Sequence, residues 1–440
     1  MTQASAEALN DDLKKGLGRA HLVLEQEADA AKRDVLIAAC LRDDAMPLEG
    51  SRAAYLFELV RLIGATGHLA AALADPLADG PGDDDIEQRY ELVGLLARDG
   101  TLGMREVLYR GQEQLIDRWL AEPVEWGPSD VPARHLIALD GIRGAVFAFG
   151  QLGRAALAGG SFSAGCDLID AARAGIEGER VDAILAEARA NDPRVDAYLL
   201  ATEAPAPPNE TELPNGWSEL PWVDVQKLIE RRVRGTGRLA AFASRWGEKA
   251  ADSELNLAAQ ALADLPRDDD DLLRAYLSVF AKRAFPLNPG ILIALVDDPR
   301  PRVPIFAIGA LELISHPAVR RVALRMADKG PHRRYSLGLL ARNWQPGDEH
   351  IAEGLLRAAA SHREASHTLG YGIRSVFDVH RSSQELVPAL RLAYQYGPCS
   401  MCREHFVAAL LRLGALPDEL RAECHWDANE EVRRLVSSEA

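Results

Sequence analysis

Apolar residues recur at intervals of three and four along most of this 440-residue chain, and this spacing limits its possible folds more than any other feature. It places apolar side chains on one face of an α-helix, which has about 3.6 residues per turn. Strict alternation of apolar and polar residues, which would indicate strands, is rare. We therefore expect an all-α chain. Clear examples of the helical spacing are Ala53, Leu56, Phe57, Val60 and Ile63, then Leu92, Leu95 and Leu96, and then Leu108, Leu115 and Leu120.

The composition favours closely packed helices. Apolar residues make up 48% of the chain and aromatic residues only 6%, so most of the core must come from aliphatic side chains. Alanine and leucine, which are abundant here, rank highest in helix propensity, and alanine lets neighbouring helices approach closely. A chain of this length has room for two or three ordinary domains or for one extended array of repeats.

A proline-rich stretch divides the chain. Four prolines fall within residues 203–216, and proline interrupts helices because it lacks a backbone N–H. We therefore predict an acidic all-helical region at 1–202, a semi-rigid linker at 203–216 and a second helical region at 217–440.

The charge is uneven between these regions. The net charge is −16, and residues 1–202 carry 20 Lys and Arg against 34 Asp and Glu, whereas residues 203–440 carry 30 against 32. An acidic surface repels nucleic acid, so nucleic acid could bind only through the C-terminal half, and a protein partner is expected instead. No run of 18 apolar residues and no secretory signal is found, and the cysteine count of five is odd. We expect no membrane span and a reducing, cytoplasmic setting.

A repeated pattern marks the second half. Asp298 and Pro299 suit the start of a helix, where aspartate caps N–H groups and proline fits the first turn. Related offsets follow Asp268 and Asp427. The pattern resembles the HEAT repeat, although Pro304 stands where a HEAT unit usually has arginine. The residues that match the motif after Pro299 are Val303, Ala307, Ala310, Leu311 and Ile314.

The resemblance implies an α-solenoid, in which antiparallel helix pairs stack into a superhelix with a concave surface. A single helix pair cannot bury its apolar face, so stacking on the next pair is required. From this we predict a non-enzymatic scaffold or adaptor for proteins, without a cofactor. Two alternatives stay open: an enzyme on a HEAT-like solenoid, similar to DNA glycosylases or lyases, and a structural module stabilised by zinc.

A basic segment is the predicted partner-binding surface. Clustered arginines grip phosphate or carboxylate groups, and aromatic side chains beside them would add stacking contacts. The competing interpretation is a set of solvated helix ends whose arginines pair with nearby carboxylates. The residues of this segment are Arg320, Arg321, Arg325, Arg333, Arg334, Tyr335, Arg342 and Trp344.

Cysteines and histidines near the C-terminus form a second candidate. Cys399 and Cys402 are three residues apart, His405 follows them, and Cys424 and His425 come later, which is a donor set that suits zinc. However, the two thiols share a helical stripe with apolar residues, which favours small core residues over metal ligands, and redox chemistry is a third possibility. His350, His362, His367 and His380 gather loosely and are expected to be surface or core residues.

Overall fold

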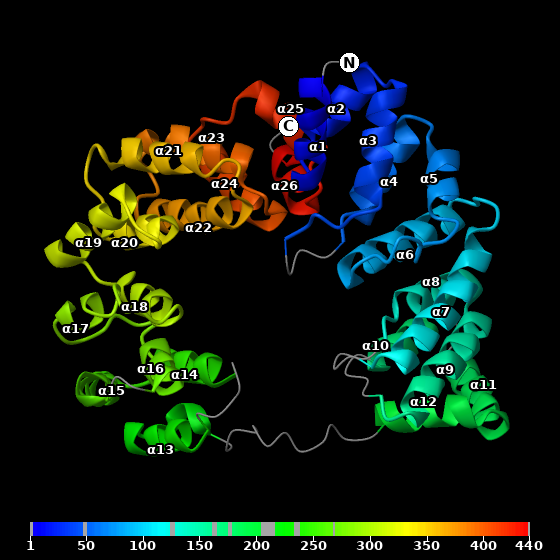
Figure 1. Ribbon diagram of the computed structural model, residues 1–440, viewed down its shortest axis with the longest axis horizontal. Helices are drawn as coiled ribbons and strands as arrows, with labels where there is room; N and C mark the ends of the chain where they lie inside the picture. The colour runs from blue at the N-terminus through cyan, green and yellow to red at the C-terminus, as the bar shows by residue number, and fades with distance from the viewer. Residues whose placement is uncertain are drawn as a thin grey trace. The chain divides into compact units, whose positions relative to one another are not determined.

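The computed structural model describes most of the chain, in the ranges 3–46, 51–123, 128–160, 165–174, 178–203, 216–232, 238–266 and 269–438. Over these residues it contains 26 α-helices, three short 3₁₀-helices and no strand (Figure 1). The prediction of an all-α fold is confirmed. No helix within the described ranges is both long enough and apolar enough to cross a membrane.

The helices group into two compact units. The first comprises Met1–Glu210 together with Glu419–Ala440, and the second comprises Thr211–Asp418. The division falls within the predicted linker at 203–216, of which residues 204–215 lie outside the described ranges. Residues 419–440, which the sequence analysis placed with the region 217–440, group by their contacts with the first unit.

The first unit contains twelve consecutive described helices and the last two of the chain. Their apolar faces meet in two clusters of buried side chains. The bounds are α1 (Gln3–Lys15), α2 (Arg19–Gln26), α3 (Ala30–Cys40), α4 (Ala53–Leu62), α5 (Thr66–Ala72), α6 (Asp83–Arg98), α7 (Met104–Ala121), α8 (Val131–Asp140), α9 (Ile142–Leu157), α10 (Gly165–Ala174), α11 (Gly178–Asn191), α12 (Pro193–Glu203), α25 (Asp418–Cys424) and α26 (Glu430–Ser437).

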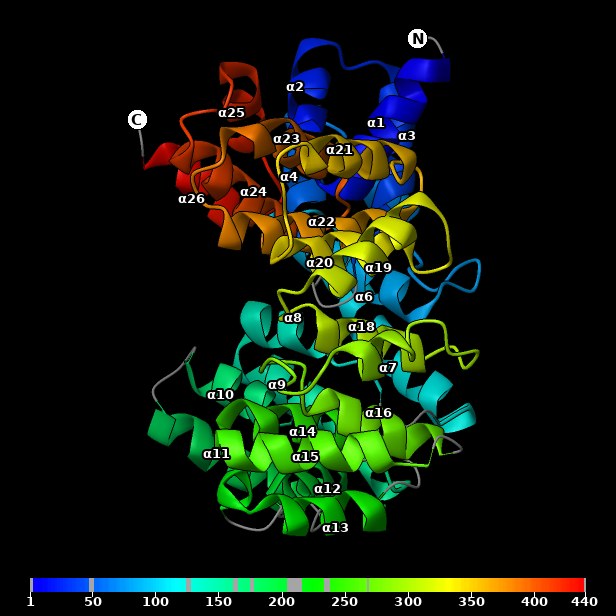
Figure 2. The ribbon, with the colours of Figure 1, turned by 90° about the vertical axis from the view of Figure 1, so that its left-hand side faces the viewer.

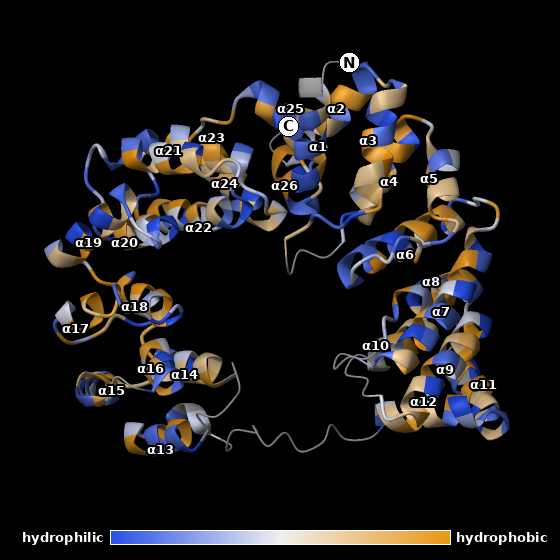
Figure 3. Ribbon diagram, viewed as in Figure 1, coloured by the Kyte–Doolittle hydropathy of each residue, from blue (hydrophilic) through white to orange (hydrophobic). Residues whose placement is uncertain are grey.

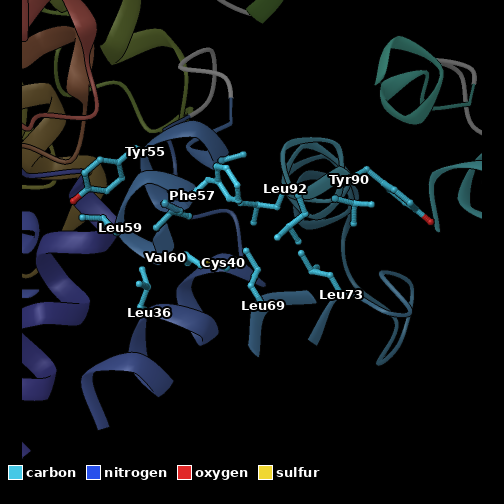
Figure 4. Close-up of a cluster of buried hydrophobic side chains, with 14 of the residues drawn as sticks. Leu36, Cys40, Tyr55, Phe57, Leu59, Val60, Leu69, Leu73, Tyr90 and Leu92 are labelled. Atoms are coloured by element: carbon cyan, nitrogen blue, oxygen red, sulfur yellow. The ribbon is translucent and has the colours of Figure 1, made fainter. Parts of the chain in front are cut away.

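The predicted apolar stripes form this core. Val60 and Leu92 are completely buried, and Phe57 is 7% exposed. Figure 4 shows these side chains of α4 and α6 meeting those of α3 and α5. Burying a leucine or valine side chain contributes roughly 1.5–3 kcal/mol, so a cluster of this size supplies much of the unit's stability.

The last residues of the chain pack on its first helices. The Arg19 guanidinium donates two hydrogen bonds to the Glu423 carboxylate, at 2.9 and 3.1 Å. The rings of His21 and Trp426 stack at 3.7 Å. Gly18 lies so close to the Glu423 carbonyl that a Cβ atom there would overlap it, which explains the need for glycine. The first unit is thus built from both ends of the sequence.

The second unit consists of α13–α24, and most of its helices pack on the next but one along the chain. Such pairs include α14 with α16, α16 with α18, α20 with α22, α21 with α23 and α22 with α24 (Figure 2). The bounds are α13 (Trp222–Arg232), α14 (Arg238–Lys249), α15 (Asp252–Asp264), α16 (Asp270–Ser278), α17 (Gly290–Ile293), α18 (Val303–Leu311), α19 (Pro317–Asp328), α20 (Ser336–Ala341), α21 (Asp348–Ala358), α22 (Arg363–Val379), α23 (Val387–Tyr396) and α24 (Ser400–Arg412).

These helices are mostly amphipathic. Figure 3 shows hydrophilic and hydrophobic residues alternating around α22. Its residues Leu369, Ile373 and Val376 are buried, at the three- and four-residue spacing of one helical face. The same helix presents charged residues on its other side, and this amphipathic pattern places the candidate site described below.

Asp298 was expected to cap the N-terminus of a helix, and it caps a turn instead. Its carboxylate accepts hydrogen bonds from the backbone N–H and the side chain of Arg300, and so it closes a tight turn ahead of α18. The helix itself begins at Val303, and Pro304 lies in its first turn, where proline is tolerated. Asp268 lies outside the described residues, and Asp269 caps α16 by accepting from Leu272 N–H.

Candidate functional site

Helices α22 and α24 pack against each other and carry polar side chains along their shared edge. Four polar residues of α22 recur at intervals of four, three and four, which places them on one helical stripe. Pro398 precedes α24, and Cys399 is the extended residue before its first turn. The stripe on α22 is formed by His367, Tyr371, Arg374 and Asp378.

Three potential metal ligands converge at one end of this edge. The ligand atoms of His367, Cys399 and Cys402 all lie within 4.8 Å of one another. Cys399 is 3% exposed and Cys402 is 7% exposed, whereas His367 is half-buried. The His367 ring lies edge-on to the ring of Tyr371, with centroids 5.0 Å apart. The cluster therefore has two buried sulfurs and one imidazole reachable from solvent.

The convergent group differs from the predicted donor set. The two cysteines are shared, but the imidazole comes from His367 of α22, and His405 is not part of the group. Cys424 and His425 belong to the other unit. The expected core stripe is present at the same time, because Phe406 and Leu410 are buried beside the thiols.

An arginine-lined pocket of about 150 Å³ lies further along α22 and α24. Arg374, Arg381 and Arg412 line it together with a single carboxylate, that of Asp378. The Arg374 Nε atom is 3.9 Å from the Asp378 carboxylate, and the Arg412 guanidinium lies 5.8 Å from the centroid of the Phe377 ring. Three positive charges thus face one negative charge beside an aromatic surface.

His405 also lines this pocket. Burial and the positive charge of Arg374 lower the pKa of His405 below its ordinary value of 6.5. His405 is therefore mostly neutral near pH 7, and the pocket takes its charge from the guanidinium groups and Asp378. A site with this balance attracts carboxylate or phosphate groups.

Arg320, from the predicted basic segment, is engaged inside the second unit. Its guanidinium donates to both carboxylate oxygens of Asp348, at 2.6 and 2.9 Å, and also to the Asn343 carbonyl. Asp348 is almost completely buried, with a side-chain exposure of 4%. This pair ties the start of α21 to α19, and so Arg320 has a structural role in the unit.

Other arginines of the segment either form ion pairs with carboxylates of the same unit or face solvent. Arg325 pairs with Asp297 at 2.8 Å, and Arg334 pairs with Glu364 at 3.1 Å. Arg334 also lies over the ring of Tyr335, while Trp344 is half-buried with its ring 6.5 Å from that of His380. Three exposed arginines form no ion pair with the residues that the structure describes: Arg321, Arg333 and Arg342.

From the sequence, His367 was expected to be a surface or core residue, and the arginines of the pocket were not singled out. His367 lies 32 positions before Cys399, so no short motif joins them. The available signal was the stripe of polar residues on α22, combined with the tendency of helices in a repeat array to pack on the next but one.

Comparison with known proteins identifies no relative. The chain matches no protein-family model, no curated protein and no solved structure.

Proposed function

We propose that the protein is a non-enzymatic interaction scaffold whose second unit is a HEAT-like α-solenoid, and that it holds an acidic segment of a partner protein in the arginine-lined pocket between α22 and α24. The observation that carries this proposal is the pocket itself, in which three guanidinium groups face one carboxylate.

The packing of the second unit supports the HEAT-like interpretation. In a helical array each element buries its apolar face on the neighbouring pairs, and packing on the next helix but one follows from that arrangement. The pairs α20 with α22 and α22 with α24 follow this order. Helix faces that are not covered by a neighbour carry polar residues, and the polar stripe on α22 lies on such a face.

The chemistry of the pocket favours a carboxylate-rich protein segment. Arginine binds carboxylates through two parallel hydrogen bonds, and each such charge-assisted bond contributes roughly 1.5–3 kcal/mol. Phe377 and Phe406 add apolar surface for the methylene groups of a glutamate or for an adjacent apolar side chain. The acidic first half of the chain makes nucleic acid a poor alternative, because it repels phosphates.

The test uses charge reversal at the pocket. Affinity capture from cells with the wild-type chain and with the double variant Arg381→Glu/Arg412→Glu identifies partners that depend on the pocket. A synthetic peptide covering the acidic segment of such a partner is then titrated against both proteins. We expect the variant to weaken peptide binding at least roughly tenfold, because two charge-assisted bonds become repulsions, and added salt to weaken wild-type binding.

The double variant Arg321→Glu/Arg333→Glu is the matched control, since it changes the same number of exposed arginines in the same unit. If only this second variant lost the partner, the basic segment predicted from the sequence would be the binding surface and the pocket would not. If neither variant lost a partner, or if duplex DNA displaced the acidic peptide, the proposal would be wrong.

A further inference from the structure

The site at the other end of the α22–α24 edge has the donors and the spacing of a metal centre. Two sulfurs and one imidazole nitrogen from two different helices lie within 4.8 Å of one another. In a tetrahedral zinc site, Zn–S bonds of about 2.3 Å and Zn–N bonds of about 2.0 Å place the donor atoms about 3.5–3.8 Å apart. Side-chain rotations that move the donor atoms by about 1 Å would bring all three to that distance.

The kind of donor selects the metal. Thiolate and imidazole are soft or borderline ligands that favour zinc, whereas magnesium and calcium require oxygen ligands. Cys399 is the N-cap residue of α24 and Cys402 lies in its first turn, where the partial positive charge at the N-terminus of a helix stabilises thiolates. His367 remains partly exposed, so an ion from solvent can reach the cluster.

We propose that His367, Cys399 and Cys402 bind one zinc ion, with water completing the tetrahedron. Coordination releases the two thiol protons to solvent and joins α22 to the start of α24. Because most residues that line the arginine-lined pocket belong to the same two helices, a bound zinc ion would fix the spacing of these two walls. Zinc binding at this site does not require a partner protein.

The experiment measures metal binding by the full-length chain directly. Reduced, chelator-treated protein is titrated with zinc against a chromophoric chelator, and the cobalt-substituted protein is examined for the thiolate-to-cobalt charge-transfer band. We expect one zinc ion per chain and a band whose intensity corresponds to two thiolates. The variants Cys399→Ser, Cys402→Ser and His367→Gln should each weaken zinc binding by roughly a hundredfold or more, since even outer-shell changes cost 10–100-fold.

Two matched variants separate this site from its alternatives. His405→Gln removes an imidazole of the donor set predicted from the sequence, and Cys40→Ser removes a buried thiol of the first unit. Both should bind zinc like the wild type. Loss of binding in His405→Gln with retention in His367→Gln would overturn the assignment of His367.

Two further outcomes would show that the cysteines do not bind zinc. Reduced protein that binds no zinc and shows no cobalt charge-transfer band would leave the thiols as core residues and refute the site. A disulfide between Cys399 and Cys402 that forms readily in air and persists in the presence of zinc would indicate redox chemistry instead. If a serine variant fails to fold by circular dichroism, His367→Gln still tests the proposal, because His367 is only half-buried.

Discussion

The pair formed by Arg320 and Asp348 gives the sharpest test of how the second unit is held together. The substitution Asp348→Asn keeps the size of the side chain and removes its charge. It leaves the guanidinium of Arg320, a side chain that is 18% exposed, with the Asn343 carbonyl and a neutral amide in place of a carboxylate. Asp348 also accepts a hydrogen bond from the Gln345 N–H, and an amide oxygen accepts this bond more weakly than a carboxylate.

The expected cost follows from the burial of the pair. Removing one partner of a buried ion pair typically costs 3–5 kcal/mol, because the other charge stays buried without compensation. Since Arg320 keeps some contact with water and one carbonyl, we expect the lower end, about 3 kcal/mol. For a unit of about 200 residues, this corresponds to a fall in Tm of roughly 6–12 °C.

The assay is calorimetric unfolding of the full chain, with hydrogen exchange in α19 and α21 to assign the transition. The control is Asp297→Asn, which removes the partner of Arg325 in an exposed pair and should cost less than about 1 kcal/mol. The double variant Arg320→Met/Asp348→Leu should recover most of the lost stability. If Asp348→Asn behaved like the control, the structural role assigned to Arg320 would be refuted, and a role in partner binding would regain support.

Three further outcomes are expected. Burial raises the pKa of Glu312 to about 7, so the folded state holds this proton more tightly than the unfolded chain does. The free energy of unfolding should therefore fall by about 3 kcal/mol between pH 4.5 and 7. Denaturant titrations of Glu312→Gln should no longer show this pH dependence. Gly247→Ala should destabilise by roughly 1–3 kcal/mol through overlap with a facing backbone carbonyl, whereas Gly354→Ala, which has open space around it, should stabilise by up to about 1 kcal/mol in thermal melts. Gly18→Ala should loosen the contact with Glu423 and speed proteolysis near residue 418, and unchanged cleavage would contradict that packing.

The helices were predictable from the sequence because apolar spacing is a local property. The stripe from Ala53 to Val60 indicates a buried helical face, and α4 places those side chains in the core. The burial of Cys399 and Cys402 was predictable for the same reason. Such local patterns are reliable because the face of a helix on which a side chain lies depends only on the helical period.

Interactions between distant helices were not predictable in the same way. The pairing of Arg320 with Asp348 and the approach of His367 to Cys399 depend on which helices become neighbours. A cluster of arginines in the sequence does not by itself distinguish an exposed binding surface from a set of internal ion pairs. Carboxylates are so common in this chain that the partner of each arginine is decided only by packing.

The return of residues 419–440 to the first unit has a consequence for synthesis on the ribosome. The helices of residues 3–203 are complete long before α26 exists, yet Cys424, Val432 and Val436 belong to their unit and are buried in it. Until residues 419–440 emerge, the surface around Gly18 and His21 that receives this segment is exposed to water. A nascent chain must therefore keep this apolar surface from aggregating while more than 200 intervening residues are translated.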